Sequence, residues 1–250
     1  NNLITLGVDY AVVVSLYVVI TLVCSLFIGW LIKQESIDSK LISAGTAICG
    51  GTAIATLSPI LRASPGQTGM TLALVFVLNA FALISFPYIG NWLGLSQTQF
   101  GVWSALAIHD TSSVVATALI YGDEASKVAT TLKLGRTIWL IPIIVIFAYA
   151  ANKQTAKNTT KSIFSRAPGQ LIPFFFLLSS FLATYVKIPV LFLETSSLIS
   201  QALFVLALYL VGISTTREQL KQLNRKHLLQ GLTIWIVVVI ATLGFVVNKI

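Results

Sequence analysis

The sequence predicts an all-α membrane protein, a polytopic bundle of about eight spanning helices in one transmembrane domain over residues 1–250. The first observation behind this is composition: 56% of the 250 residues are hydrophobic and only 10% are charged, whereas soluble domains carry about 25% charged residues. The second is a mean hydropathy of +0.89. The third is the presence of long uncharged runs such as residues 10–32, since about 20 helical residues cross a hydrocarbon core.

Charge, cysteine content and motifs exclude several classes of function. The net charge of +8 comes from Lys and Arg in loops between apolar runs, where cations set membrane orientation, so we expect no nucleic-acid partner. Cys24 and Cys49 both lie in apolar runs and indicate neither a disulfide framework nor a metal site. No nucleotide, nucleophile or metal motif is present, so we expect neither an enzyme nor a cofactor. Nothing at Asn1 resembles a cleaved signal peptide.

The apolar runs define the predicted elements in chain order. The loops at 33–40, 152–169 and 215–227 all fall on one side and hold ten Lys and Arg, against six on the other side. The positive-inside rule then places both chain termini outside. Leu220 and Leu223 in the last of these loops predict an amphipathic turn at the membrane surface. The predicted crossings are residues 10–32, 41–61, 69–95, 100–121, 125–151, 170–186, 196–213 and 228–247.

The second crossing, residues 41–61, is rich in glycine around Cys49, Gly50 and Gly51. Glycine weakens a helix by about 1 kcal/mol relative to Ala, and in lipid a broken helix is tolerated only where its freed backbone faces protein or water. These three residues are therefore our candidate for an unwound step. The alternative is a small-residue face on which two intact helices pack closely.

His109, Asp110 and Thr111 form a polar step midway along the apolar run 100–121. A side chain that carries charge at that depth costs roughly 2.5 to 3.5 kcal/mol on insertion scales, so something must offset it. Three interpretations stay open: a proton relay, because His titrates near neutral pH; a substrate or coupling-ion site; or a structural pair bonded across helices. In the preceding crossing, Asn79 predicts a bond between helices rather than a ligand.

Lys133 and Arg136 lie one turn apart on the helix predicted for residues 125–151. Two cations on one face are suited to binding sulfate, phosphate or carboxylate. They could instead reach the headgroups on their long stems. A third interpretation pairs them with Asp110 in an internal charge network that need not touch substrate.

Four motifs stand in order along the chain: GTAICGGTAIA at 45–55, AIHDTSSVVA at 107–116, KLGRTIWLIP at 133–142 and LYLVGISTT at 208–216. With these motifs the chain resembles the YeiH-like family of bacterial inner-membrane proteins, whose members are often labelled sulfate exporters. Members commonly have glutamine where this chain has Ser113, and they begin with further helices ahead of Tyr10.

This resemblance implies a fold like that of sodium/proton antiporters and bile-acid symporters, with inverted repeats and two broken crossing helices. Residues 1–95 would form an incomplete first repeat and residues 100–250 the second. The broken crossings would be residues 41–61 and 196–216, the latter weakened at Gly212 and followed by Thr215. Substrate and ion sites in such folds lie where half-helix ends meet, and the positive ends favour anions.

The predicted function is a secondary transporter of a small inorganic or organic anion in the bacterial inner membrane, with sulfate suggested by the family label. His109 and Asp110 would couple transport to protons or sodium. The partners expected are the lipid bilayer and the anion, with homo-oligomerisation left open. The alternative is a non-transporting membrane scaffold or sensor derived from a truncated transporter.

Overall fold

The computed structural model describes residues 2–151, six helical residues between 196 and 209, and residues 225–250. The crossing predicted at 170–186 lies outside these residues, as do most of the crossing at 196–213 and most of the turn at 215–227. Every element in the described part is helical. The helices are α1 (Asn2–Leu31), α2 (Ser36–Ala47), α3 (Gly51–Ile60), α4 (Pro65–Trp92), α5 (Gln97–Ala107), α6 (Thr111–Tyr121), α7 (Asp123–Ile138), α8 (Leu140–Ala151) and α13 (Arg225–Lys249).

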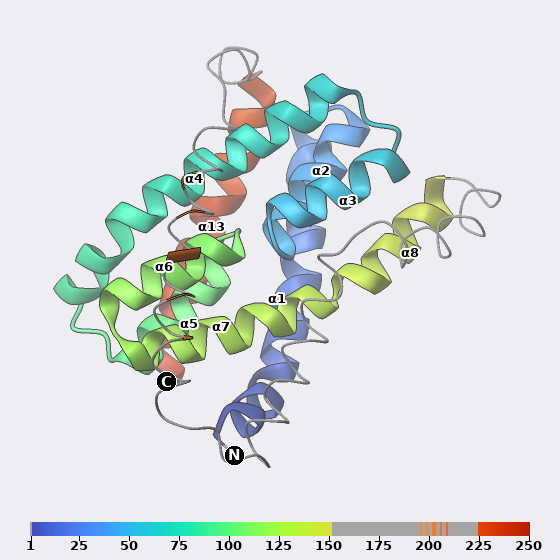
Figure 1. Cartoon of the computed structure of the whole chain (residues 1–250). Helices are drawn as coiled ribbons and strands as arrows, with labels where there is room; N and C mark the ends of the chain where they lie inside the picture. The colour runs from blue at the N-terminus through green and yellow to red at the C-terminus, as the bar shows by residue number, and fades with distance from the viewer. Residues whose placement is uncertain are drawn as a thin grey trace.

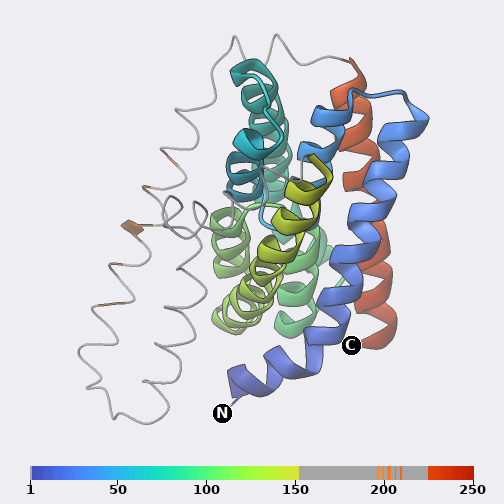
Figure 2. The ribbon, with the colours of Figure 1, turned by 90° about the vertical axis from the view of Figure 1, so that its right-hand side faces the viewer.

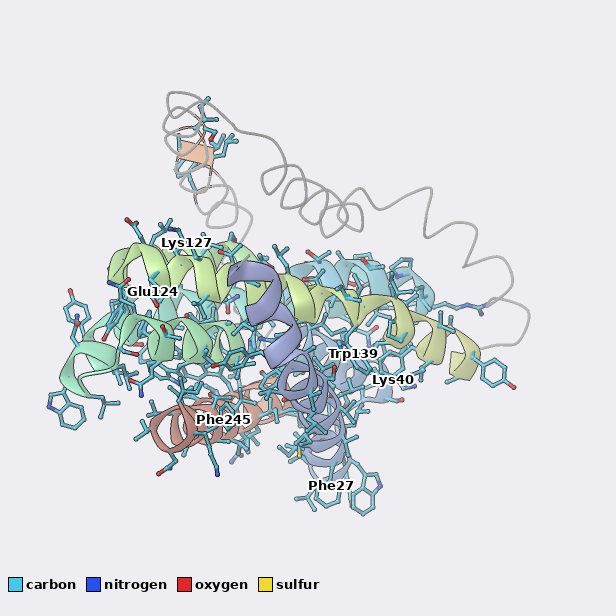
Figure 3. All side chains as sticks on the ribbon, turned by 90° about the horizontal axis from the view of Figure 1, so that it is seen from below. Phe27, Lys40, Glu124, Lys127, Trp139 and Phe245 are labelled. Carbon is cyan, nitrogen blue, oxygen red and sulfur yellow. The ribbon has the colours of Figure 1, made fainter. Side chains whose placement is uncertain are left out.

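Four described helices are long and apolar enough to cross a membrane, at Tyr10–Leu31, Pro65–Trp92, Asp123–Ala150 and Arg225–Lys249. Their outward faces carry large apolar side chains such as Phe27, which is 59% exposed and points away from the bundle (Figure 3). Exposed apolar surface on this scale suits lipid rather than water. The prediction of a membrane helix bundle is confirmed.

Local sequence signals set the helix ends. Ser64 and Ser96 each begin a helix with a capping box, in which the serine side chain accepts from the backbone three residues on and a glutamine side chain accepts in return. This arrangement provides acceptors for two backbone N–H groups that have no partner within the helix. The predicted long helix at 125–151 is present but interrupted at Trp139 between α7 and α8. Pro142 explains the interruption, because proline has no N–H for the carbonyl one turn earlier.

Helices α5 and α6 form a hairpin rather than one crossing. The Phe100 ring near the start of α5 stacks on the Tyr121 ring at the end of α6, with centroids 3.8 Å apart. The Tyr121 hydroxyl donates to the Leu95 carbonyl at 2.5 Å, and the Glu124 N–H donates to Gln97 Oε1 at 3.0 Å. The segment therefore enters, turns at residues 108–110 and returns to the side from which it came.

Helices α2 and α3 form a second hairpin, with its turn at residues 48–50. A Cβ added to Gly45 on α2 would lie 2.9 Å from Ile54 on α3, so the two helices pack side by side. The beginning of α2 and the end of α3 both face the start of α4, where Gln67 approaches Asp38 and Thr68 Oγ1 donates to Ser58 Oγ at 2.9 Å. Figures 1 and 2 show this hairpin and the α5–α6 hairpin entering from opposite ends of the bundle.

These hairpins correct the expectation of full crossings at 41–61 and 100–121. The described residues contain four long helices and two re-entrant hairpins in place of six crossings. Half-helices of 10 to 12 residues are about 15 to 18 Å long at 1.5 Å per residue, so each one reaches only mid-membrane. An apolar run of that total length fits a crossing and a hairpin equally well. The inverted repeat and its boundaries stay a prediction.

The hairpins leave both termini at one end of the bundle, and the assignment of that end to the outer side stays a prediction. Both termini lie at the same end (Figures 1 and 2), as the loop charges predict. A full crossing at residues 41–61 would have put Arg62 at the end of the termini. Because the segment is a hairpin, Arg62 lies at the opposite end, together with the Lys33 loop. Among the described residues, five cations then lie at that opposite end and two at the end of the termini, which strengthens the positive-inside bias. They are Lys33, Lys40, Arg62, Arg225 and Lys226 against Lys127 and Lys249.

Aromatic side chains in the core pack the α5–α6 hairpin against α4 and α13. Phe86 stacks on Trp103 with centroids 4.2 Å apart, and Trp235 lies beyond Phe86 at 6.3 Å. Tyr88 and Trp92 on the same stretch of α4 are 75% and 84% exposed, as expected of aromatic side chains at an interface. Phe86, by contrast, is buried and belongs to the core.

Candidate functional site

The two hairpin turns meet each other in the interior. Gly50 has φ +63° and ψ −116°, a conformation that residues with a Cβ avoid. A Cβ placed there would lie 3.2 Å from the Asp110 nitrogen and 3.3 Å from the His109 carbonyl carbon. Only glycine lets the two backbones approach this closely. The predicted interruption at Cys49, Gly50 and Gly51 is therefore present, and its partner is the turn at residues 108–110.

Two buried cations on α7 bind the carboxyl-terminal ends of the half-helices. Arg136 Nη1 donates to the carbonyls of Ala105 at 2.5 Å and Leu106 at 3.1 Å, while Nη2 donates to the Thr46 carbonyl at 2.9 Å. Lys133 Nζ donates to the Ile108 carbonyl at 2.7 Å. Arg136 thus joins the end of α2 to the end of α5. Cations are stabilising at helix carboxyl termini because the last carbonyls have no partner within the helix.

This arrangement decides between the earlier interpretations of Lys133 and Arg136. Both are fully buried, so neither reaches the headgroups. The ion pair found among the described residues joins His227 to Asp38. Asp110 acts on Lys133 electrostatically without forming such a pair. The two cations are held instead by backbone carbonyls and by the Tyr17 ring, which lies 4.6 Å from the Arg136 guanidinium carbon. Their positive charge has no acidic side chain bonded to it within the described part of the chain.

The amino-terminal ends of the other two half-helices face the same centre. Asp110 caps α6, accepting from the Ser113 N–H at 3.2 Å and from the Ser112 hydroxyl. Helix α3 begins at Gly50 with no side-chain acceptor for its first N–H groups. Thr52 in its first turn is exposed, and Asp110 and Thr111 are half-buried. The start of α3 therefore presents an uncapped positive dipole end at the crossing, whereas the Asp110 side chain occupies that end of α6.

His109 is not bonded to Asp110 in the described structure. Its backbone N–H donates to Asn79 Oδ1 at 3.1 Å, so the prediction of an interhelical bond for Asn79 holds. Three groups here keep unpartnered buried atoms: both His109 ring nitrogens, Asn79 Nδ2 and Arg136 Nε. Buried polar groups are normally paired, so these atoms need an explanation. Asn79 Nδ2 and Arg136 Nε can only donate, and one nitrogen of a neutral imidazole donates as well.

The site therefore has more donors than acceptors. Lys133 and Arg136 bring two buried basic side chains, Asp110 brings a carboxyl group that caps α6, and the uncapped start of α3 adds a positive dipole end. A ligand that supplies acceptor oxygens and negative charge would satisfy the unpaired donors. The hairpin tips are thus suited to a small oxyanion or carboxylate.

Sequence reasoning found part of this site. Cys49, Gly50, Gly51, His109, Asp110, Thr111, Lys133 and Arg136 all lie at or next to the paired turns, whereas Gly212 and Thr215 lie outside the described residues. Tyr17, whose hydroxyl donates to the Leu106 carbonyl at 2.6 Å, was missed. Tyr17 lies in the uncharged run 10–32 among other hydroxyl side chains, so nothing in the sequence distinguished it. The backbone carbonyls that bind the two cations cannot be read from side-chain identity.

Comparisons with known proteins give one consistent family. The family described as conserved hypothetical protein 698 matches residues 1–231. A UPF0324 membrane protein of Porphyromonas gingivalis is 41% identical over 239 residues, which cover 92% of this chain and 70% of the relative. UPF0324 membrane proteins of Vibrio parahaemolyticus and Bdellovibrio bacteriovorus are 42% and 40% identical, covering 92% and 95% of this chain and 73% and 71% of theirs. No solved structure matches the chain.

Proposed function

The chain belongs to the family of UPF0324 membrane proteins, multi-pass proteins of bacterial membranes, and from that premise we propose that it is a secondary transporter, not an enzyme, that carries a small anion across the inner membrane. The substrate class comprises sulfate and small organosulfur anions. One observation carries the proposal: two re-entrant hairpins enter from opposite ends of the bundle and meet at Gly50 and His109.

Opposed hairpins supply what alternating access requires. Interrupted helices at membrane depth are tolerated where their freed backbone groups face protein or a binding cavity, and transporters place substrate at such half-helix ends near the midplane. Each hairpin here separates the tips from one side of the bundle. Movement of the α2–α3 hairpin would open the site to the side of the Lys33 loop, and movement of the α5–α6 hairpin would open it to the side of the termini.

The electrostatics of the tips favour an anion over a cation. Lys133 and Arg136 already occupy the negative carboxyl-terminal ends of the half-helices, where a cation would otherwise bind. The positive amino-terminal end of α3, which no side chain caps, remains for a negatively charged ligand, whereas the Asp110 side chain already caps α6. Asn79 Nδ2 and Arg136 Nε are also buried donors without a hydrogen-bond partner, and an anion could accept from them. Coupling of anion movement to protons or sodium is part of the proposal.

Flux through reconstituted vesicles tests this function. We expect purified protein in proteoliposomes to move radiolabelled sulfate down its gradient, and Lys133→Met to lower the initial rate at least about tenfold because it removes a buried positive charge. The matched control is Lys127→Met, since Lys127 is exposed on the same helix and should leave the rate unchanged. Sulfate, thiosulfate and small sulfonates form the substrate panel. Absence of flux for every member would favour the scaffold or sensor.

A further inference from the structure

A second buried polar cluster lies away from the hairpin tips, where the end of α1, the beginning of α2 and the beginning of α13 meet (Figure 2). His227 Nε2 on α13 lies 3.0 Å from Asp38 Oδ2 on α2. Gln34, just beyond α1, lies 3.2 Å from His227 Nδ1 and 3.4 Å from Asp38 Oδ2 through its Nε2. Asp38 and His227 are 3% and 2% exposed, so an acid and a base are in contact out of water.

The cluster continues one helical turn further into the bundle at Gln230. Its Nε2 donates to the Ser25 carbonyl at 2.9 Å and to Ser39 Oγ at 3.0 Å. Gly29 makes room for this contact, because a Cβ there would lie 2.0 Å from Ser39 Oγ and 2.7 Å from Gln230 Nε2. The Gln230 side-chain amide on α13 is therefore hydrogen-bonded to both α1 and α2.

Two buried acceptor oxygens of this cluster are unpaired, whereas the hairpin tips hold unpaired donors. A third atom without a hydrogen bond, His227 Nε2, faces Asp38 Oδ2 in the ion pair. Asp38 Oδ1 and Gln230 Oε1 are buried and have no hydrogen-bond partner, and Gln230 is fully buried. Gln67 on α4 approaches the Asp38 carboxylate without bonding Oδ1. Leaving a buried acceptor unsatisfied costs about 1 to 3 kcal/mol. A bound positive charge would satisfy an oxygen of this kind.

We propose that Asp38, His227 and Gln230 form a binding site for one small monovalent cation, either a proton or a sodium ion, separate from the anion site. The carboxylate and amide oxygens are hard ligands suited to such a cation. The charged group that acts on both Asp38 and His227 is Glu35, ahead of α2, and it adds negative charge. Of the nearby cations, Lys226 donates to the Lys33 carbonyl at 2.8 Å.

This site links a cation to the hairpin that carries Gly50, a consequence that rests on the proposed transport function. Asp38 lies in the first turn of α2, and α2 leads directly to the turn at residues 48–50. An occupied site would hold the start of α2 against α13, and an empty site would release it. Cation binding would thereby control movement of the α2–α3 hairpin, which assigns coupling to Asp38 and His227 instead of His109 and Asp110.

Thermal unfolding of the full chain in detergent tests the cation site without any transport. The midpoint is measured from pH 5 to pH 8 in sodium chloride and in choline chloride, for the native chain, Asp38→Asn and the control Asp123→Asn, which is exposed at the opposite end. If sodium is the ligand, the native midpoint rises by several degrees on replacing choline with sodium. If the proton is the ligand, the midpoint changes with pH in choline as well. Either response should disappear in Asp38→Asn and persist in Asp123→Asn.

A second variant keeps the test decisive where Asp38→Asn does not fold. Glu35→Gln removes the exposed acid that acts on Asp38 and His227, leaves the buried side chains in place, and should reduce the sodium or pH response at least twofold. A native chain that responds to neither ion, or a response that is equal in Asp38→Asn and the native chain, would overturn the cation site. Loss of sulfate flux alone, with the thermal response intact, would instead count against transport.

Discussion

Gly50→Ala should lower the unfolding midpoint of the protein by about 4 to 8 °C and reduce anion flux to near background. A positive φ costs a residue with a Cβ about 1 to 2 kcal/mol in the left-handed helical region, and 1 kcal/mol corresponds to roughly 2 to 4 °C for a chain of this size. The ψ of −116° lies outside that region, so the strain is greater. The new methyl group would also meet backbone atoms of His109 and Asp110, which cannot rotate away.

Gly94→Ala is the matched control for this substitution. Gly94 has the same φ of +63°, and a Cβ there would meet nothing within 4 Å. Gly94→Ala should lower the free energy of unfolding only by the conformational cost of a Cβ at positive φ, about 1 kcal/mol. It should retain full flux. The difference between the two variants therefore measures the approach of the hairpin tips. Equal stability and equal flux in both would mean that the turns do not meet.

Arg136→Met should destabilise the protein by about 3 kcal/mol or more and abolish transport. The substitution leaves the carbonyls of Thr46, Ala105 and Leu106 without their donor, and each buried group left unsatisfied costs about 1 to 3 kcal/mol. It also removes the positive charge between the carboxyl-terminal ends of α2 and α5, which then repel one another. Unfolding in denaturant, followed by tryptophan fluorescence, measures the loss.

Arg136→Lys separates charge from geometry. Lysine keeps the positive charge but has one nitrogen in place of the planar fork, so it cannot bond carbonyls of both half-helices at once. We expect a stability between that of the native chain and that of Arg136→Met. Arg62→Met, an exposed change near the end of the bundle, should be neutral. Native stability in Arg136→Met would contradict the assigned role.

Sequence reasoning reached the interrupted helix at Gly50 because adjacent glycines in lipid have few structural uses. It missed the interruption at His109, because residues 109–111 were interpreted by the chemistry of their side chains and not as the boundary between two helices. A signal was present: Asp110 followed by Thr111, Ser112 and Ser113 is a helix start inside an apolar run. Read in that way, the segment predicts two half-helices.

Other features had no signal in the sequence. Whether a half-helix continues or returns is set by packing between distant segments, such as Phe100 on Tyr121, and apolar length is the same in both cases. The partners of Lys133 and Arg136 are backbone carbonyls, which every residue possesses. The pairing of Asp38 with His227 joins positions 189 residues apart, and neither residue stands out in its own segment.

Stabilisation by anions at constant sodium concentration and pH tests the account most directly. The unfolding midpoint of the native chain is measured in sodium sulfate, thiosulfate, acetate and gluconate, together with Lys133→Met and Lys127→Met. We expect at least one small anion to raise the midpoint of the native chain and of Lys127→Met in a saturable manner, and to leave Lys133→Met unchanged. A midpoint that no anion moves, or a shift that Lys133→Met retains in full, would contradict an anion site at the hairpin tips.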